Sequence, residues 1–417
     1  MKKWTLGQLG KTKPKQTQYK AKQTQFWSQK MLLRLTTNGR RIFDCNFGVA
    51  LQRPLFAFLL VILVCNFYIW FLTSVFFLEK PNISNQIPEM ALRLTKFQKR
   101  LCNVLQEDLP ICWRPFDDLA KYLGTDEKTL LDQIEHLKEL GVIRRFRALI
   151  NYRALGLTST LVAAHVPADS LPAVADAVNA LEEVSHNYLR QHYYNLWFTL
   201  QAQSSQKIEL TLSTLSGRFG IDFHSLPVVR FFKLDVRFDV EGEGPAGAGF
   251  LQDVGRLYGE EKVELNENQK RILSALQEEL RLTPEPFDFM CGEGLEREDV
   301  LQIIKGLIDK GVIRRIAAVV NHRRLGFVAN VMFAGEVPQD RIVQAGERLA
   351  RFGIVSHCYE RMTFEGWPYN LFAMIHGRSM GEIQHAINRF IEAEKIDSFV
   401  LLPTARELKK QPVKYHF

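Results

Sequence analysis

The chain contains the same set of motifs twice, and this duplication limits the fold more than any other feature of the sequence. Three motifs recur in the same order: Gly-Val-Ile-Arg-Arg, Asn-x-Arg-x-Leu-Gly and Val-Ser-His-x-Tyr-x-Arg. The copies lie at 141–145, 151–156 and 184–190, and again at 311–315, 321–326 and 355–361. A nearly constant offset over so long a span indicates a duplicated unit. The repeated residues are rich in Arg, His and Tyr, so we expect both halves to hold something anionic.

Each copy is predicted to begin with a winged helix-turn-helix. Apolar side chains at a spacing of three and four predict a helix with one buried face. Helices are expected at 94–105, with a counterpart at 265–276, and at 116–123 and 125–140. Thr125 is the expected N-cap of the last of these, and Gly141 its terminator. Residues 142–150 suit a hairpin strand, which completes winged domains at 92–156 and 263–326.

The rest of each half is predicted to alternate strands and helices in the order βαββαβ, which is that of a ferredoxin-like domain. In the first copy, strands are expected near 158–166, 184–190, 196–202 and 228–238, with helices near 171–180 and 206–219. In the second copy, strands are expected near 328–337, 355–361, 371–377 and 398–403, with helices near 339–352 and 380–393. The fold class is therefore α+β, with ferredoxin-like domains at 157–240 and 327–406. A Gly-rich linker at 241–262 would let the two sheets pair inside one chain.

The segment before the repeats has a different character. Residues 1–53 form a basic tail: up to residue 54 there are twelve Lys and Arg and one acid, Asp44, whereas the whole chain has a net charge of +8. The repeats are therefore net acidic. An uncharged run within 54–80 has the length of a transmembrane helix and exceeds the apolar core of a signal peptide. Two interpretations stay open, a membrane anchor or a start placed too early, with residues 1–89 outside the working protein.

The cysteines indicate a reducing compartment. They are Cys45, Cys65, Cys102, Cys112, Cys291 and Cys358. Their spacing shows no CxxC pair, no disulfide framework and no pattern with paired histidines, so no metal site is expected. We therefore expect a cytoplasmic protein, anchored to a membrane if the apolar segment belongs to it.

A winged helix-turn-helix joined to a ferredoxin-like domain resembles the leucine-responsive, asparagine-type (Lrp/AsnC) transcriptional regulators, so DNA binding must be weighed. A recognition helix needs Lys and Arg to meet phosphates. The helices expected in that place carry net charges of −3 at 125–140 and −1 at 295–310. Nucleic acid is therefore not the expected partner, and a transcriptional regulator is kept as an alternative function.

The motifs resemble most specifically the siroheme decarboxylases, in which two similar subunits pair. The similar segments are 184–188 and 194–198 for one subunit, and 321–323, 355–361 and 367–377 for its partner. The likeness covers about residues 92–406, so the chain resembles both subunits fused in order, with the halves paired intramolecularly and a homodimer as a further option. The resemblance implies siroheme as substrate. It implies loss of its C12 and C18 acetate carboxylates, giving 12,18-didecarboxysiroheme for an alternative haem route or for the haem of nitrite reductase.

The chemistry implied by the resemblance needs few parts. Loss of carbon dioxide leaves carbanion character on a methylene carbon, which is delocalised into the macrocycle and then protonated by a general acid such as His or Tyr. No cofactor is expected beyond the iron of the siroheme substrate, because carbon dioxide leaves its bonding electrons behind. The sequence accordingly shows no phosphate-binding Gly loop and no nicotinamide or pyridoxal signature.

Roles for single residues follow from the repeats. Planar guanidinium groups bind carboxylates with two hydrogen bonds. Substrate binding is predicted for Arg144, Arg145, Arg314, Arg315, Arg190, Arg361, Tyr152, Tyr188, Tyr359, Asn195 and Asn370. The tyrosines and asparagines in this set either bind substrate or fix the hairpin. His357, His322 and His186 are the catalytic candidates for proton transfer, and His322 or His357 for ligation of the substrate iron.

The two halves differ at the positions that carry chemistry. Tyr152 aligns with His322, and the insertion 365–368 occurs only in the second half. Duplicates that diverge at such positions suggest one asymmetric site, so we predict a single pocket near the hairpin of the second half, supported by the first. A tetrapyrrole-binding protein without catalysis is the second alternative function.

Overall fold

The first half begins with three helices that lie where the apolar spacing predicts them. The computed structural model describes residues 92–242 and 262–417. The helices are α3 (Lys96–Leu105), α4 (Pro115–Leu123) and α5 (Glu127–Glu139). The N-cap of α5 is Asp126 and not Thr125: its carboxylate accepts a hydrogen bond from the backbone N–H of Thr129 at 2.9 Å. Gly141 follows the helix with a φ of +67°, a left-handed conformation that ends it.

The second half departs from this plan at its middle helix. Its elements are α9 (Glu267–Gln277), the 3-10 turn η2 (Asp288–Met290) and α10 (Arg297–Asp309). The residues after η2 adopt positive φ angles: +103° at Gly292, +50° at Glu293 and +82° at Gly294. A right-handed helix cannot continue through these conformations, so the turn remains short.

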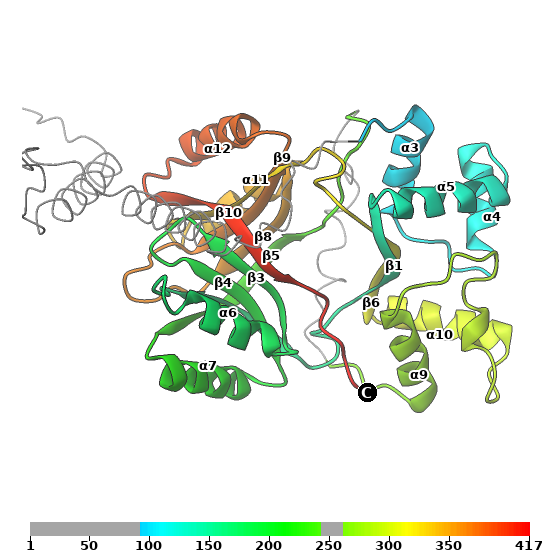
Figure 1. Cartoon of the computed structure of the whole chain (residues 1–417), viewed down its shortest axis with the longest axis horizontal. Helices are drawn as coiled ribbons and strands as arrows, with labels where there is room; N and C mark the ends of the chain where they lie inside the picture. Colours follow the sequence, from blue (N-terminus) through cyan, green and yellow to red (C-terminus); the bar gives the residue numbers. More distant parts are fainter. Residues whose placement is uncertain (1–91, 243–261) are drawn as a thin grey trace, which may run out of the picture. The chain divides into compact units, whose positions relative to one another are not determined.

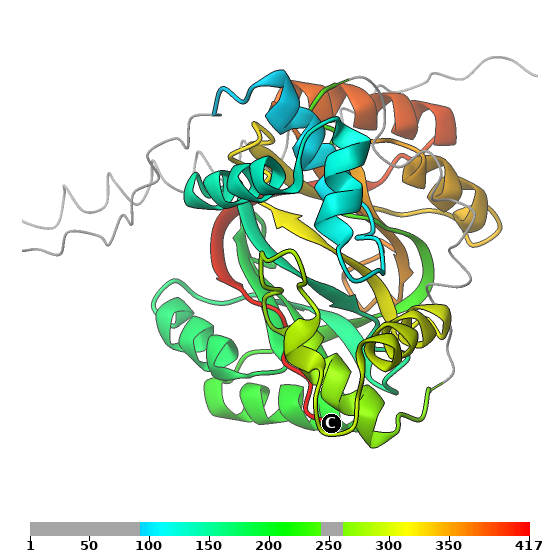
Figure 2. The same ribbon diagram turned by 90° about the vertical axis from the view of Figure 1, so that its right-hand side faces the viewer.

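The two predicted hairpin strands pair with each other instead of forming a hairpin within each half. β1 (Ile143–Ile150) and β6 (Ile313–Val320) make a two-stranded antiparallel ribbon in which Arg147 lies opposite Ala317. Phe146 and Ile316 on one face of the ribbon join the core formed by the helices of both halves. The other face is turned toward the barrel that the remaining strands form, as Figures 1 and 2 show.

The remaining strands form one closed barrel. Its first-half elements are β2 (Thr158–Ala164), α6 (Leu171–Ala180), β3 (Val184–Arg190), β4 (Leu196–Ala202), α7 (Ser205–Phe219) and β5 (Phe223–Leu234). Its second-half elements are β7 (Ala329–Gly335), α11 (Ile342–Ala350), β8 (Val355–Arg361), β9 (Leu371–Gly377), α12 (Met380–Glu394) and β10 (Phe399–Lys410). The strand order is β10-β3-β4-β2-β5-β8-β9-β7. This confirms the duplicated α+β fold and the pairing of the two sheets.

Two long strands close the barrel, and both differ in extent from the prediction. β5 begins at Phe223 and not near 228, and β10 runs to Lys410 and not to 403. The first part of β5 pairs with β2 and its second part with β8 of the other half. Likewise β10 pairs first with β7 and then with β3. The extra length is what carries each strand from one sheet to the other.

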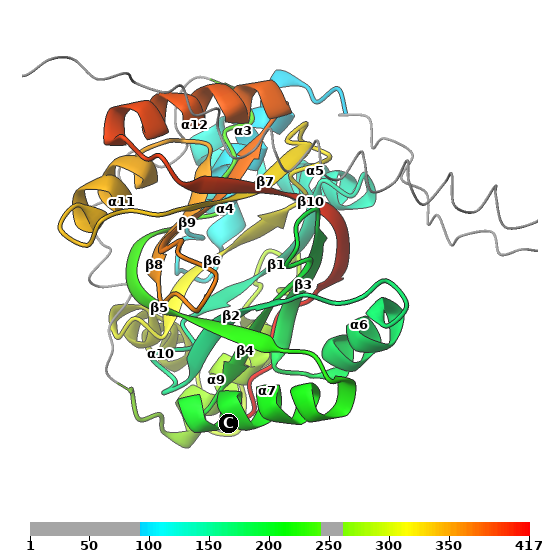
Figure 3. The same ribbon diagram turned by 90° about the vertical axis from the view of Figure 1, so that its left-hand side faces the viewer.

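Helices cover the outside of the barrel, and large side chains fill one end of its interior. Figure 3 shows α6 and α7 beside one sheet and α11 and α12 beside the other. The interior cluster contains Trp197, Trp367 and Phe372, all at most 2% exposed. The predicted packing role of the two tryptophans agrees with this burial.

Several predictions fall outside the described residues. These are the basic tail at 1–53, the apolar segment at 54–80 with its alternative boundary at 89, and most of the linker at 241–262. Within residues 92–242 and 262–417, no helix is both long and apolar enough to cross a membrane.

Candidate active site

Two histidines of the second half share one serine hydroxyl. Ser356 Oγ lies 2.8 Å from His357 Nδ1, 3.0 Å from His376 Nε2 and 3.3 Å from the carbonyl oxygen of Met374. The arrangement that satisfies all three contacts at once has Ser356 donate its single proton to the Met374 carbonyl, which can only accept, and each imidazole donate to Ser356. This assignment leaves His357 with an unprotonated Nε2 and His376 with an unprotonated Nδ1.

His322 joins these histidines from the segment that follows the ribbon. Its ring lies 5.3 Å from the ring of His376 and stacks on Phe238 at 5.6 Å. His322 is 4% exposed, and neither its Nε2 nor Nδ1 of His376 has a hydrogen-bond partner among the described residues. Buried polar atoms without a partner are uncommon, so these two nitrogens indicate a site that a ligand completes.

Burial keeps the histidines of this region uncharged. It lowers the pKa of His186 to about 4, of His376 to about 3 and of His322 to about 2. The pKa of His357 is lowered well below its ordinary value by burial and then by the neighbouring His376. At neutral pH these imidazoles therefore present lone pairs and N–H groups, not positive charge.

The first half carries a different set at the corresponding place. Ser185 Oγ lies 2.8 Å from His186 Nδ1 and 2.7 Å from the hydroxyl of Thr199. The sixth residue of β4 is Gln201, where β9 has His376, and Gln201 Oε1 accepts a hydrogen bond from the Tyr415 hydroxyl at 3.1 Å. The second imidazole is thus replaced by an amide, and the clustered histidines belong to the second half.

Arg190 and Arg361, which end the repeated histidine motifs, are buried, and each bonds to the neighbouring strand that comes from the other half. Arg190 Nη1 donates to the carbonyl of Leu402 at 2.6 Å, and Arg361 Nη1 donates to the carbonyl of Leu226 at 2.8 Å. Each guanidinium also lies over the ring of the tyrosine two residues before it. The Nε of each has no partner within the described part of the chain. The pair holds strands together and leaves one N–H on each for a ligand.

Cationic groups from both halves act electrostatically on Tyr188 and His322. Burial raises the pKa of Tyr188, while the charges of Arg144 and Arg323 act to lower it. The same two arginines and Lys410 help to lower the pKa of His322. Glu407 is the carboxylate that acts on Tyr188, and it also acts on Lys410. Positive charge therefore exceeds negative charge around this pair of side chains, which favours an anionic ligand.

A second group of cations lies among tyrosines. Burial raises the pKa of Tyr415 to about 12, against the opposing charges of Arg314 and Arg147. Arg314 Nη2 donates to the carbonyl of Ile150 at 3.2 Å, and its Nε lacks a partner among the residues described. Tyr152 acts on both Tyr415 and Arg361. Both halves therefore contribute cations to the site.

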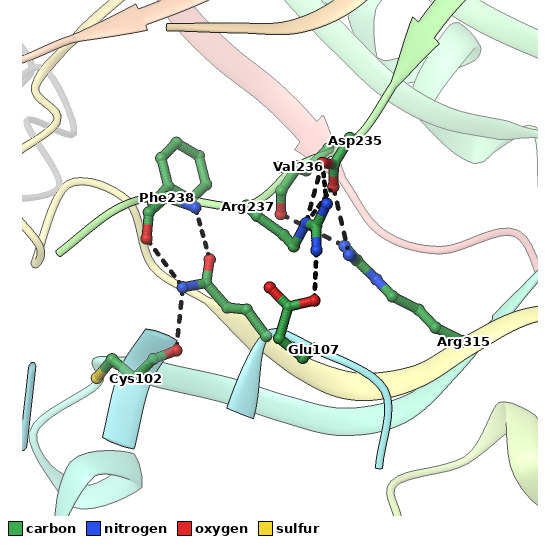
Figure 4. Close-up of polar contacts among 8 residues, drawn as sticks. Cys102, Glu107, Asp235, Val236, Arg237, Phe238 and Arg315 are labelled. Carbon is green, nitrogen blue, oxygen red and sulfur yellow. Dashed lines mark hydrogen bonds and ion pairs between the residues drawn. The ribbon is translucent and has the colours of Figure 1, made fainter. Parts of the chain in front are cut away.

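Arg315 lies elsewhere, in an ion-pair network that Figure 4 shows. Its Nη1 is 3.3 Å from Asp235, which also pairs with Arg237 at 2.7 Å. Arg237 in turn pairs with Glu107, which follows α3 by two residues. The network fastens β6 and α3 to the segment that leaves β5. The Arg315 guanidinium thus already has a carboxylate partner inside the protein, and its role in substrate binding stays a prediction.

Asn195 and Asn370 also have a structural position. The amide of Asn195 accepts from the N–H of Val166 at 2.9 Å and donates to its carbonyl at 2.8 Å. Asn370 makes the same two bonds, at the same distances, with Val337. Both ends of each amide are used, so of the two roles left open from the sequence the structure supports fixing the hairpins. Arg145 is exposed on the ribbon, and its role in substrate binding stays a prediction.

Some residues of the region were not among the predicted site residues. They include Arg147, Arg323, Ser356, His376, Lys410 and Tyr415. His376 had a signal, because Met374 and His376 alternate along β9 with the buried Ala373 and Ile375. Lys410 and Tyr415 had none, since the last strand was expected to end at 403. Their position depends on the crossing of β10 to the other half.

Known proteins resemble the chain in both of its halves. An AsnC-like ligand binding domain matches residues 154–233 and 324–409, and a siroheme decarboxylase NirDL-like HTH domain matches residues 98–144. The chain is similar to the siroheme decarboxylase of Hydrogenobacter thermophilus, with 38% identity over 76% of this chain and 94% of the relative. The siroheme decarboxylase alpha subunit of Desulfovibrio desulfuricans is 36% identical over 36% of this chain and 87% of that subunit.

A solved structure is similar over both halves. The crystal structure of the siroheme decarboxylase NirDL aligns with a TM-score of 0.58 and 34% identity, covering 77% of this chain and 94% of that one. NirDL has also been solved in complex with an iron-uroporphyrin III analogue, and that structure aligns equally well.

Proposed function

The chain belongs to the siroheme decarboxylase family, and we propose that it removes acetate carboxylates from siroheme as carbon dioxide. By resemblance to the family, these are the C12 and C18 acetates. The observation that carries the proposal is the set of cations from both halves around buried, neutral histidines with unpaired nitrogens. Such a set suits a flat, iron-containing macrocycle with carboxylates around its rim.

The cations suit the carboxylates that do not react. A reacting carboxylate loses its charge as carbon dioxide forms, so an ion pair with it would stabilise the ground state more than the transition state. We therefore place the non-reacting carboxylates on Arg144, Arg314, Arg323 and Lys410. The reacting acetate is placed against the neutral histidines at Ser356, where burial removes water from it.

We propose different roles for His357 and His322. His357 offers an unprotonated Nε2, which suits a bond to the substrate iron and cannot donate a proton. His322, with a buried unpaired Nε2, is placed beside the reacting acetate as a proton-transfer group. Neither role requires a charged imidazole, which agrees with the lowered pKa of both rings. His186 contacts Ser185 in the same way as His357 contacts Ser356. We propose that His186 contacts the substrate from the first half.

The reaction balances without a further cofactor. The bond between the methylene carbon and the carboxylate breaks, and its electron pair stays on the methylene carbon and is delocalised into the macrocycle. One proton then completes the methyl group, so no electron is gained or lost. Burial raises the pKa of Tyr188, so its phenol is protonated at neutral pH. We propose that Tyr188 and His322 pass the proton to the methylene carbon and that a proton from water replaces it. We expect no cofactor beyond the iron of the substrate.

One experiment tests the function. The purified protein is incubated with siroheme without oxygen, and the tetrapyrrole is analysed by mass spectrometry. We expect two successive losses, each of the mass of one carbon dioxide molecule. A changed visible spectrum of siroheme without any loss of mass would identify a carrier. An unchanged spectrum and mass would refute the proposal.

A transcriptional regulator has less support from the helices. On α5, the ammonium group of Lys128 lies 2.7 Å from Asp132, and on α4 Lys121 lies 2.7 Å from Asp117. Cations paired in this way are less available to phosphates, and the net charge of 125–140 is negative. Salt-sensitive binding of the protein to duplex DNA, with no loss of carboxylate from siroheme, would favour the regulator.

We further propose that the protein is cytoplasmic. Cys102, Cys112, Cys291 and Cys358 are free, which agrees with a reducing compartment. The mass of the native protein would decide whether residues 1–89, with the candidate anchor at 54–80, belong to it. Light scattering of the purified protein would decide whether two copies form a homodimer.

A further inference from the structure

The ribbon of β1 and β6 contains one pair of equivalent positions that the two halves fill differently. Arg144 and Arg314 occupy the same place in their motifs. Three positions later, the first half has Arg147 and the second half has Ala317. These two residues lie directly opposite each other in the ribbon. They therefore mark the place where the two halves are related locally by a twofold rotation.

Arg147 lies on the face of the ribbon that is turned toward the barrel. Its neighbours Phe146 and Ala148 belong to the helical core on the other face. The charge of Arg147 helps to lower the pKa of His186 inside the barrel and acts on Tyr415. Ala317, which is 1% exposed, provides no charge on the other side of the pair.

The environment of Arg147 lacks a counter-ion. Its pKa is lowered first by burial and then by the charge of Arg145, and Tyr415 acts in the opposite direction. None of the described residues forms a carboxylate ion pair with it. A half-buried guanidinium without a carboxylate is unfavourable unless an anion from outside the chain joins it.

The position of Tyr415 next to it is fixed. Gln277 Oε1 accepts from the N–H of Tyr415 at 2.7 Å, and Gln277 Nε2 donates to its carbonyl at 2.9 Å. The Tyr415 hydroxyl in turn donates to Gln201. The end of the chain is thus fastened between α9 and β4, and the unpaired cation has a rigid aromatic neighbour.

We propose that Arg147 is a specificity-determining residue that selects one of two orientations of the tetrapyrrole. The repeated arginines, Arg144 and Arg314, provide one cation on each side of the local twofold, so a flat molecule with carboxylates around its rim could bind in two orientations. A cation present on one side only distinguishes them, because only one orientation brings a carboxylate to it. This inference rests on the proposed function, and it concerns which acetate reaches the histidines at Ser356.

The test compares four proteins: the wild type, Arg147→Gln, the exchange Arg147→Ala with Ala317→Arg, and Arg218→Ala on the outer helix α7 as a control for loss of one charge. Siroheme affinity is measured from its visible spectrum. The position of the first acetate lost is determined by NMR of the singly decarboxylated product at short times.

We expect Arg147→Gln to weaken siroheme binding about tenfold, the usual size of a lost charge-assisted hydrogen bond, and to mix the two singly decarboxylated isomers. The exchange variant keeps the number of cations but should favour the other isomer. Arg218→Ala should behave as the wild type. Thermal melting of each variant checks that it is folded.

Two outcomes would overturn the inference. One is a wild-type isomer ratio and affinity in Arg147→Gln. The other is a wild-type isomer ratio in the exchange variant. That result would mean that the half carrying the cation does not determine the orientation of the tetrapyrrole. Neither outcome is confused with failure of the proposed function, since that failure would appear as loss of no carboxylate by the wild type.

Discussion

At the scale of single residues, the Ser356 hydroxyl organises the second-half histidines. It has one proton and three polar neighbours, and its bond to a backbone carbonyl decides which nitrogen of each imidazole carries hydrogen. The Ser185 hydroxyl of the first half has one imidazole and one threonine hydroxyl as neighbours. It therefore does not determine which nitrogen of His186 carries hydrogen. The two repeated serines therefore offer a matched comparison within one chain.

Replacing Ser356 by Ala should lower the rate of decarboxylation by about tenfold to a hundredfold, the range seen when a group that orients a catalytic residue is lost. Both rings would lose their acceptor, and Nε2 of His357 would no longer be reliably unprotonated. The rate is measured from the loss of siroheme under anaerobic conditions. Ser185→Ala is the control and should reduce the rate less. Equal rates for the two variants would mean that the tautomer argument is wrong.

The buried His322 predicts a dependence of stability on pH. Its folded pKa of about 2 lies below the ordinary value of 6.5, so the unfolded chain takes up the proton first. The stabilisation is complete above about pH 6.5 and is lost as the pH falls below it. At about pH 5 the loss for one such imidazole reaches at most about 2 kcal/mol.

The measurement is the free energy of unfolding in urea at two pH values, one above 7 and one near 5. We expect His322→Tyr, which copies Tyr152 of the first half, to lose less stability between them than the wild type. His136 on the surface of α5 supplies the control variant His136→Gln, which should follow the wild type. A slope unchanged by His322→Tyr would show that this imidazole is not buried in solution.

At the scale of elements, the long strands β5 and β10 join the halves. Each leaves the sheet of its own half after a few residues and pairs with a strand of the other. In doing so, β5 brings Phe232 against α11 of the second half, where Gly346 leaves room for its ring. Because the Phe232 ring lies so close to Gly346, the pairing of β5 with the second half requires a residue without a side chain at position 346.

Gly346→Ala should destabilise the protein by about 1–3 kcal/mol, because the added methyl group would overlap the Phe232 ring. Gly217→Ala in α7 is the control: nothing lies within 4 Å of a methyl group there, so alanine should stabilise the helix by about 0.5–1 kcal/mol. Urea denaturation of both variants measures the difference. Stabilisation by Gly346→Ala would contradict the packing of β5 on α11.

At the scale of the whole molecule, the described residues form one interlocked structure from two similar halves. The ribbon takes one strand from each half, and the barrel closes only through the exchanged strands. The core beneath the ribbon likewise contains helices of both halves. Each half alone would expose unpaired strand edges and apolar surface.

Produced as separate chains, residues 92–242 and 262–417 should therefore not form stable monomers. We expect each to aggregate or to self-associate, and the two produced together to form a one-to-one complex that decarboxylates siroheme. Size-exclusion chromatography with light scattering gives the masses. A stable, folded monomer of either half would show that the exchanged strands are not required.

Much of the fold could be predicted because it depends on local patterns. Apolar spacing located α3 and α5, and alternation located β3 and β8, since these elements bury one face within a few residues. The second half has only the short turn η2 where its predicted winged helix-turn-helix requires a middle helix, and Gly292 and Gly294 follow that turn with positive φ angles. The extent of β10 was missed because its last residues pair with a strand of the other half, which no local pattern reveals.

The amino-acid sequence by itself determined the duplication, the fold class and the residue types that an anionic tetrapyrrole requires. Only the tertiary structure decided which of these residues face one another. It fastened Arg315 to Asp235 and the two asparagines to hairpins, and it brought His376 beside Ser356 and Arg147 to the ribbon face turned toward the barrel. The physical reason is that the strand exchange and the pairing of the ribbon set these neighbours, and both join residues far apart in the chain.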